Sequence, residues 1–105
     1  MKVSSLVKGM VLCLSDEEKI AWLSDDYPLP TGEVELRFAP LVMEGMLPGT
    51  TLKRDELIVY LGHDKEPVDK RDPEYKRLVR RVMVKEKTAV VMGYNFKHLE
   101  PHPNF

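Results

Sequence analysis

The sequence predicts a small, mainly β domain with one short helix, which places it in the α+β class. The clearest observation is that residues 33–38 alternate charged and apolar side chains, the period of a half-buried strand. Further short apolar runs are separated by turns that contain proline and glycine. The chain has 105 residues, of which 43% are hydrophobic and 31% are charged. We therefore expect one globular domain over residues 1–105.

Two apolar runs, 10–15 and 19–23, flank the charged residues 16–18. This pattern favours a β-hairpin. The alternative is a helix that begins with a capping box from Ser15 to Glu18. We favour the hairpin, because only five or six residues would follow before the next polar stretch, which is short for a helix.

The strand at 33–38 has one apolar face, and we expect Pro40 to end it. Residues 27–32 and 44–49 are predicted turns, because both contain proline and glycine. The alternation resumes over 53–61 with apolar residues on both faces, which predicts a central strand or one covered on both sides. The apolar face of the first strand comprises Val34, Leu36 and Phe38.

The segment from Asp72 to Met83 is the one predicted helix, with an aspartate cap and a proline in its first turn. Apolar residues follow at helical spacing, and basic residues occupy the other face. The rival interpretation is a strand that turns at 85–87 into a second strand over 88–92. Both interpretations hold if a short helix passes into a strand near Arg81. The basic face comprises Lys76, Arg77, Arg80 and Arg81.

Charge is unevenly distributed along the chain, although the net charge is only −1. Residues 1–52 carry four basic and eight acidic side chains, a net charge of −4. Residues 53–105 carry twelve basic and nine acidic ones, a net charge of +3, and residues 70–87 alone reach +5 with eight against three. This polarity favours association with an acidic protein partner, or self-association in which the acidic half of one copy meets the basic half of another.

The basic segment also suits phosphates, because arginine binds phosphate oxygens in pairs. A nucleic-acid or nucleotide binder is therefore the alternative function, with nearby aromatic rings stacking on bases. A pI of about 6.3 counts against a dedicated nucleic-acid binder. The predicted binding residues of this region are Lys76, Arg77, Arg80, Arg81, Lys85, Tyr94 and Phe96.

A second candidate surface is the turn that contains Met43, Met46 and Leu47. If the core does not absorb these side chains, they form an exposed apolar patch, which is typical of a contact surface. Methionine adapts easily to the shape of a partner. The alternative is that the three residues fill gaps in the core.

Motifs for catalysis or metal binding are absent from the sequence. There is no Gly-x-Ser-x-Gly elbow, no P-loop lysine and no dinucleotide fingerprint. His98 and His102 lie four apart, but the prolines at 101 and 103 oppose a helix, so we expect a solvent-facing tail rather than a metal site. In that tail, Phe96 and Leu99 are expected to dock on the body of the domain. Cys13 lies in an apolar run, which predicts a buried, inert thiol.

We accordingly expect no enzyme, no catalytic residue, no metal and no cofactor. A small enzyme that uses a carboxylate and a histidine from separate loops is the least favoured function. No apolar run reaches the roughly 20 residues of a membrane-spanning helix. The first residues lack the apolar stretch of a secretory signal, and the single cysteine makes no internal disulfide. These features predict a cytoplasmic protein without membrane association.

Two segments resemble parts of SH3-like small barrels. The opening Leu6-Val7-Lys8-Gly9-Met10-Val11 is similar to the lead into their first strand, and Tyr94-Asn95-Phe96-Lys97-His98-Leu99-Glu100-Pro101 to their closing turn and last strand. Relative to the pattern of SH3-like barrels, residues 62–81 would be an insertion. The resemblance implies a small, partly open barrel that binds proteins or nucleic acids and seldom catalyses. The expected function is a non-catalytic binding module, such as a small phage-type regulatory or inhibitory accessory protein.

Overall fold

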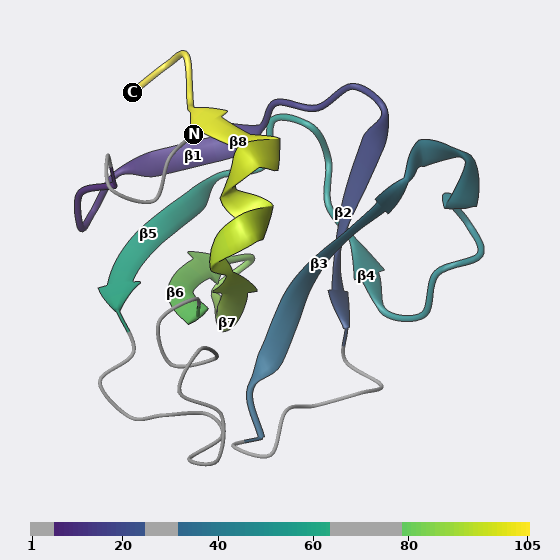
Figure 1. The fold of residues 1–105 in the computed structure, drawn as a ribbon, viewed down its shortest axis with the longest axis horizontal. Coiled ribbons are helices and arrows are strands. Elements are labelled where there is room, and N and C mark those ends of the chain that lie inside the picture. Colours follow the sequence, from purple (N-terminus) through teal and green to yellow (C-terminus); the bar gives the residue numbers. More distant parts are fainter. Residues whose placement is uncertain (1–5, 25–31, 64–78) are drawn as a thin grey trace.

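The computed structural model of the chain describes residues 6–24, 32–63 and 79–105. Within these ranges the protein is mainly β, as the sequence predicts. One mixed sheet has the strand order β4-β2-β3-β7-β6-β5-β1-β8 and curls into a half-barrel (Figure 1). None of the helices in these ranges is long and apolar enough to span a membrane. The elements are β1 (Val11–Leu14), β2 (Lys19–Ser24), β3 (Val34–Pro40), η2 (Leu41–Met43), β4 (Thr50–Thr51), β5 (Ile58–His63), β6 (Val79–Val84), β7 (Lys87–Met92), η3 (Gly93–His98) and β8 (Leu99–Pro101), where η marks a 3-10 helix.

Both apolar runs at the start of the chain form strands, but the predicted hairpin between them is wrong. β1 pairs antiparallel with β5 and β8, whereas β2 pairs antiparallel with β3 and β4. Residues 15–18 therefore carry the chain from one part of the sheet to another. The alternative helix over this segment is also wrong, because Lys19–Ser24 is extended. Apolar patterning identifies a strand but does not choose its neighbours.

The strand predicted at 33–38 is confirmed as β3, which ends at Pro40 as expected. Leu36 is buried in the main core, and Val34 and Phe38 pack against that core. The central strand predicted over 53–61 is confirmed in part: β5 (Ile58–His63) lies between β6 and β1, but residues 53–57 are not in a strand. The two clearest apolar patterns of the sequence thus both correspond to strands of the sheet.

The predicted helix from Asp72 to Met83 is wrong over its described part. Val79–Val84 form strand β6, which pairs with β5 and β7, and residues 64–78 lie outside the described ranges. The rival strand is confirmed, with a tight turn in which Lys85 and Glu86 adopt positive φ values of 51° and 64°. Alternate burial of Val82 and Val84 gives the period of two that a strand requires.

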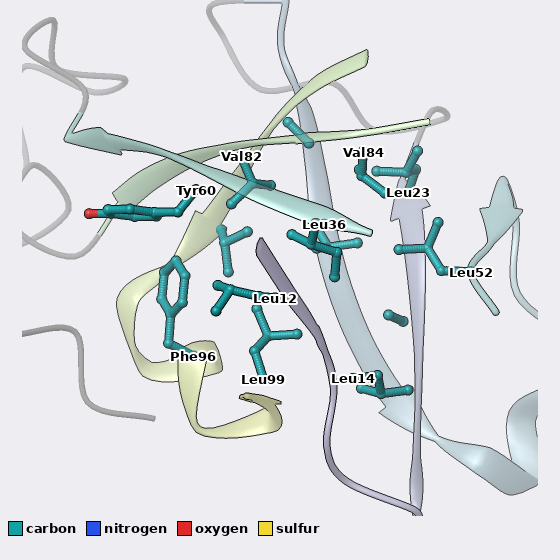
Figure 2. Packing of buried hydrophobic residues seen from close by; sticks show 14 residues of the cluster. Leu12, Leu14, Leu23, Leu36, Leu52, Tyr60, Val82, Val84, Phe96 and Leu99 are labelled. Atoms are coloured by element: carbon teal, nitrogen blue, oxygen red, sulfur yellow. The ribbon is translucent and has the colours of Figure 1, made fainter. Parts of the chain in front are cut away.

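The main core fills the concave side of the half-barrel (Figure 2). Phe96 and Leu99 are almost completely buried there, so their predicted docking is confirmed. The ring of Phe96 meets that of Tyr60 edge to face, with 5.9 Å between ring centroids. η3 also packs against β3, β7 and β8, and so covers the open side of the curled sheet (Figure 1).

Replacing Phe96 by alanine should test the role of this packing. Because the ring is fully buried in the core, we expect the Phe96→Ala variant to lose about 3–5 kcal/mol of unfolding free energy, measured by urea denaturation. Tyr94 lies in the same 3-10 helix but is 61% exposed, so the Tyr94→Ala control should change stability by only about 0.5 kcal/mol. Equal losses in the two variants would contradict the burial described here.

Candidate functional site

The connection between β3 and β4 displays large apolar side chains to solvent. We call residues 41–47 the apolar loop. Val42 is 86% exposed and Met46 is 69% exposed, and Leu41 and Met43 are also exposed. Leu47 differs, because it packs against a second small cluster formed by Ile20, Trp22 and Ala39. Of the three residues singled out in the sequence, Met43 and Met46 are therefore at the surface, and Leu47 is partly buried.

Backbone hydrogen bonds hold the apolar loop in shape. The N–H of Leu41 donates to the carbonyl of Glu18 (2.8 Å), which ties the loop to the turn between β1 and β2. Two further bonds close successive turns, from the N–H of Glu44 to Leu41 O (3.0 Å) and from Met46 N–H to Met43 O (3.0 Å). Gly45 between them has a φ of +86°, a conformation in which glycine has no steric penalty. The exposed side chains thus project from a defined backbone.

A cleft of about 450 Å³ lies beside the apolar loop. Three connections meet there: the β1–β2 turn, the apolar loop and the segment between β4 and β5. The apolar lining combines the exposed Leu41 with core side chains that reach the bottom of the cleft. The lining residues are Leu14, Ile20, Leu41 and Leu52, with Glu17, Lys19, Glu44, Lys53 and Arg54 as the charged ones.

The described part of the predicted basic strip does not form one face. Arg80 is 7% exposed and lies on the same side of β6 as the core residue Val82. Arg81 points to the other side, where its Nε and Nη2 donate to both carboxylate oxygens of Glu33 (2.9 and 2.8 Å). A strand points consecutive side chains to opposite sides, whereas the predicted helix would have turned these two arginines only about 100° apart, within one broad face.

The remaining residues of that prediction are divided between surface, core and undescribed segments. The ammonium group of Lys85 pairs with Glu56 at 3.0 Å. Tyr94 is exposed, but Phe96 belongs to the core and offers no ring to a ligand. Lys76 and Arg77 lie outside the described residues.

The predicted solvent-facing histidine tail is wrong, because His98 and His102 are both buried. The ring of His98 stacks on Phe38, with 5.1 Å between centroids, and its Nδ1 lies 3.2 Å from Oδ2 of Asp16. This contact joins the end of η3 to the β1–β2 turn beside the cleft. The sequence contains no signal for it, because the two residues are 82 positions apart.

His102 is held by two backbone groups. Its Nδ1 accepts a hydrogen bond from the N–H of Asn104 (3.2 Å), so the proton is on Nε2, which donates to the carbonyl of Asp55 (3.2 Å). Cys13 is buried as predicted, and burial raises the pKa of its thiol, which keeps it protonated. Within the described ranges, no three or more histidine, cysteine or acidic side chains gather in a way that could hold a metal ion.

Comparisons with protein-family models, with curated proteins and with solved structures each returned no match to this chain.

The turn below the cleft should show an acid-dependent stability. The N–H of Glu18 donates to Oδ1 of Asp16 (3.0 Å), and this bond, followed by the contact with His98, lowers the pKa of Asp16 from its ordinary 3.8. Because the folded-state pKa is the lower one, the carboxylate stabilises the fold above pH 3.8, and this contribution is lost as the pH falls through the folded-state pKa.

We therefore expect the Asp16→Asn variant to unfold at a lower urea concentration than the native chain at neutral pH. The difference should shrink once the pH falls below 3.8. Glu17 is exposed in the same turn and makes no hydrogen bond within the described part of the chain, so Glu17→Gln is the matched control. A difference that stays constant from neutral pH into the acid range would contradict this role of Asp16.

Proposed function

We propose that this chain is a non-catalytic binding module that engages a protein partner through the apolar loop and the adjacent cleft. The observation that carries the proposal is the exposure of Val42 and Met46 on a backbone held by hydrogen bonds. Clustered apolar side chains at the surface are typical of contact sites. A partner that covers them releases the water around them, which is the main driving force of protein association.

The composition of this surface supports a protein as the ligand. Apolar side chains are exposed on the loop, and the cleft beside it is lined by both apolar and charged side chains. An apolar centre with a polar rim, enriched in methionine and arginine, is the usual anatomy of a protein–protein interface. Two of the exposed side chains are methionines, which adapt to the partner's surface.

An SH3-like relationship remains part of the proposal. Its support is that the first segment leads into β1 and the second ends in β8, and that these two strands pair with each other. A scaffold of this kind would present its connections as the binding surface. We propose a regulatory or inhibitory accessory role, because a module that binds without catalysis acts by occupying its partner.

The basic segment contributes less to the proposal than the apolar loop. Arg81 and Lys85 already have glutamate partners, and Arg80 is buried. The nucleic-acid alternative rests on the same residues, and no contact within the described ranges favours it. The apolar loop is accordingly the region to test first.

Introducing charge into the apolar loop should abolish binding. We expect the double variant Val42→Asp, Met46→Asp to weaken capture of protein partners from a lysate by at least about thirtyfold, as for an interface hot spot. Both side chains are exposed, so the unfolding free energy should change by only about 0.5 kcal/mol. The protein that the native chain captures from the lysate is first identified, and its affinity for the immobilised native and variant chains is then measured by titration.

The matched control is Val7→Asp, which adds a charge at an exposed apolar residue outside the apolar loop and the cleft beside it. Binding should be retained in this variant. Unchanged binding by the loop variant, or equal loss in the control, would overturn the proposed function.

A further inference from the structure

We propose that the cleft beside the apolar loop binds a peptide segment of the partner in which an acidic side chain stands next to a large apolar one. In this arrangement Arg54 holds the carboxylate, and the cleft takes the apolar side chain. The inference rests on the proposed function, because it specifies the chemistry that the same surface recognises.

The cleft has an apolar lining, of which Leu41 is the part that the fold leaves open to solvent. Leu14, Ile20 and Leu52 are core residues whose side chains nevertheless line the cleft. Leu41, at the edge of the apolar loop, lines it too and is 44% exposed. The volume of about 450 Å³ lies within the range of natural ligand sites. An apolar side chain inserted here would displace water mainly from Leu41.

Arg54 is positioned but not neutralised. Its Nη1 donates to the carbonyl of Asp16 (3.1 Å), and it forms no ion pair within the described part of the chain. A carbonyl contact fixes the guanidinium without compensating its charge. The other N–H groups remain available for the paired hydrogen bonds that arginine makes with a carboxylate.

The charges around the cleft favour an acidic segment. Lys19, Lys53 and Arg54 line it together with two carboxylates, those of Glu17 and Glu44, so the cations are in excess. Lys19 and Lys53 also lack an ion pair among the described residues. Three cations of β3 and the β6–β7 hairpin differ, because each of them has a glutamate partner. These pairs are Arg37–Glu35, Arg81–Glu33 and Lys85–Glu56.

The position of Arg54 also indicates how a bound peptide segment would be placed along the surface. Arg54 and Leu14 line both this cleft and a neighbouring one of about 270 Å³, so the two clefts meet at these residues. The neighbouring cleft contains the acidic Asp55 and Glu100, which repel a carboxylate. In the first cleft three cations outweigh Glu17 and Glu44, whereas in the neighbouring one Arg54 alone faces Asp55 and Glu100, so the acidic side chain of the ligand belongs in the first cleft.

The test is a selection from a library of random linear peptides displayed on phage, with the whole chain immobilised. We expect the selected peptides to be enriched in aspartate or glutamate next to leucine, isoleucine, phenylalanine or methionine. The affinity of the strongest peptide is then measured by fluorescence anisotropy. It should fall by at least about tenfold in the Arg54→Gln variant and should weaken with added salt.

Two controls separate charge recognition from a structural effect. Arg37→Gln removes an arginine that is paired with Glu35 and does not line the cleft, and it should bind the peptide normally. Replacing the acidic residue of the peptide by its amide leaves the protein unchanged. This replacement should cost the same factor as Arg54→Gln.

The outcomes distinguish this inference from the proposed function. Peptides that lose affinity for the Val42→Asp, Met46→Asp variant, but show no acidic enrichment and no dependence on Arg54, would overturn the acidic recognition alone. A selection that yields no peptide sensitive to the loop variant would overturn both.

Discussion

Burial of Phe96 and Leu99 is the contact on which the rest of the structure depends. It brings the last part of the chain onto the first strand, so that β1 pairs with β8 rather than with β2. The chain must then leave β1 through residues 15–18 toward the other part of the sheet. The N–H of Ser15 donates to the carbonyl of His98 (2.8 Å) at this crossing. The turn that carries charged residues to the cleft is therefore fixed by packing at the opposite end of the sequence.

The same crossing explains why the apolar loop is exposed. Its first residue, Leu41, is bonded to Glu18 in the β1–β2 turn, and Leu52, beyond β4, donates to the carbonyl of Ala21 (2.8 Å). Both ends of the connection are thus attached to β2 and its preceding turn. The residues between them have too little sheet beneath them to bury every side chain, and only Leu47 reaches the small cluster around Trp22. Exposure of Val42 and Met46 is a consequence of these two anchors.

The sequence predicts local structure where one face of an element is buried, and it fails where distant segments decide. Strand β3 follows directly from the alternation of Val34, Leu36 and Phe38, because a period of two allows only one face to meet the core. The prediction of a hairpin between β1 and β2 was wrong, because the hydrophobic pattern contains no information about which strands pair. The apolar spacing up to Met83 fits a helix as well as a strand, and pairing with β5 and β7 decides in favour of the strand. Burial of His98 could not be predicted from the sequence either, because its neighbours Phe38 and Asp16 come from other elements.

The fold brings together charges from the acidic and basic parts of the sequence. Arg81 from the basic segment is hydrogen-bonded to Glu33 from the acidic half. These two opposite charges therefore compensate each other and connect β6 to the start of β3. This partly buried pair with two hydrogen bonds compensates both charges, so neither contributes to long-range recognition. Lys19 and the adjacent pair Lys53 and Arg54 lie far apart in the sequence and were not singled out by local charge density, yet they line one cleft together with apolar side chains. Cations next to an apolar surface select a ligand by both features, because the apolar contact supplies affinity and the charge supplies orientation and specificity. The recognition chemistry of this chain therefore follows from which charges the fold leaves uncompensated, and not from where the sequence concentrates them.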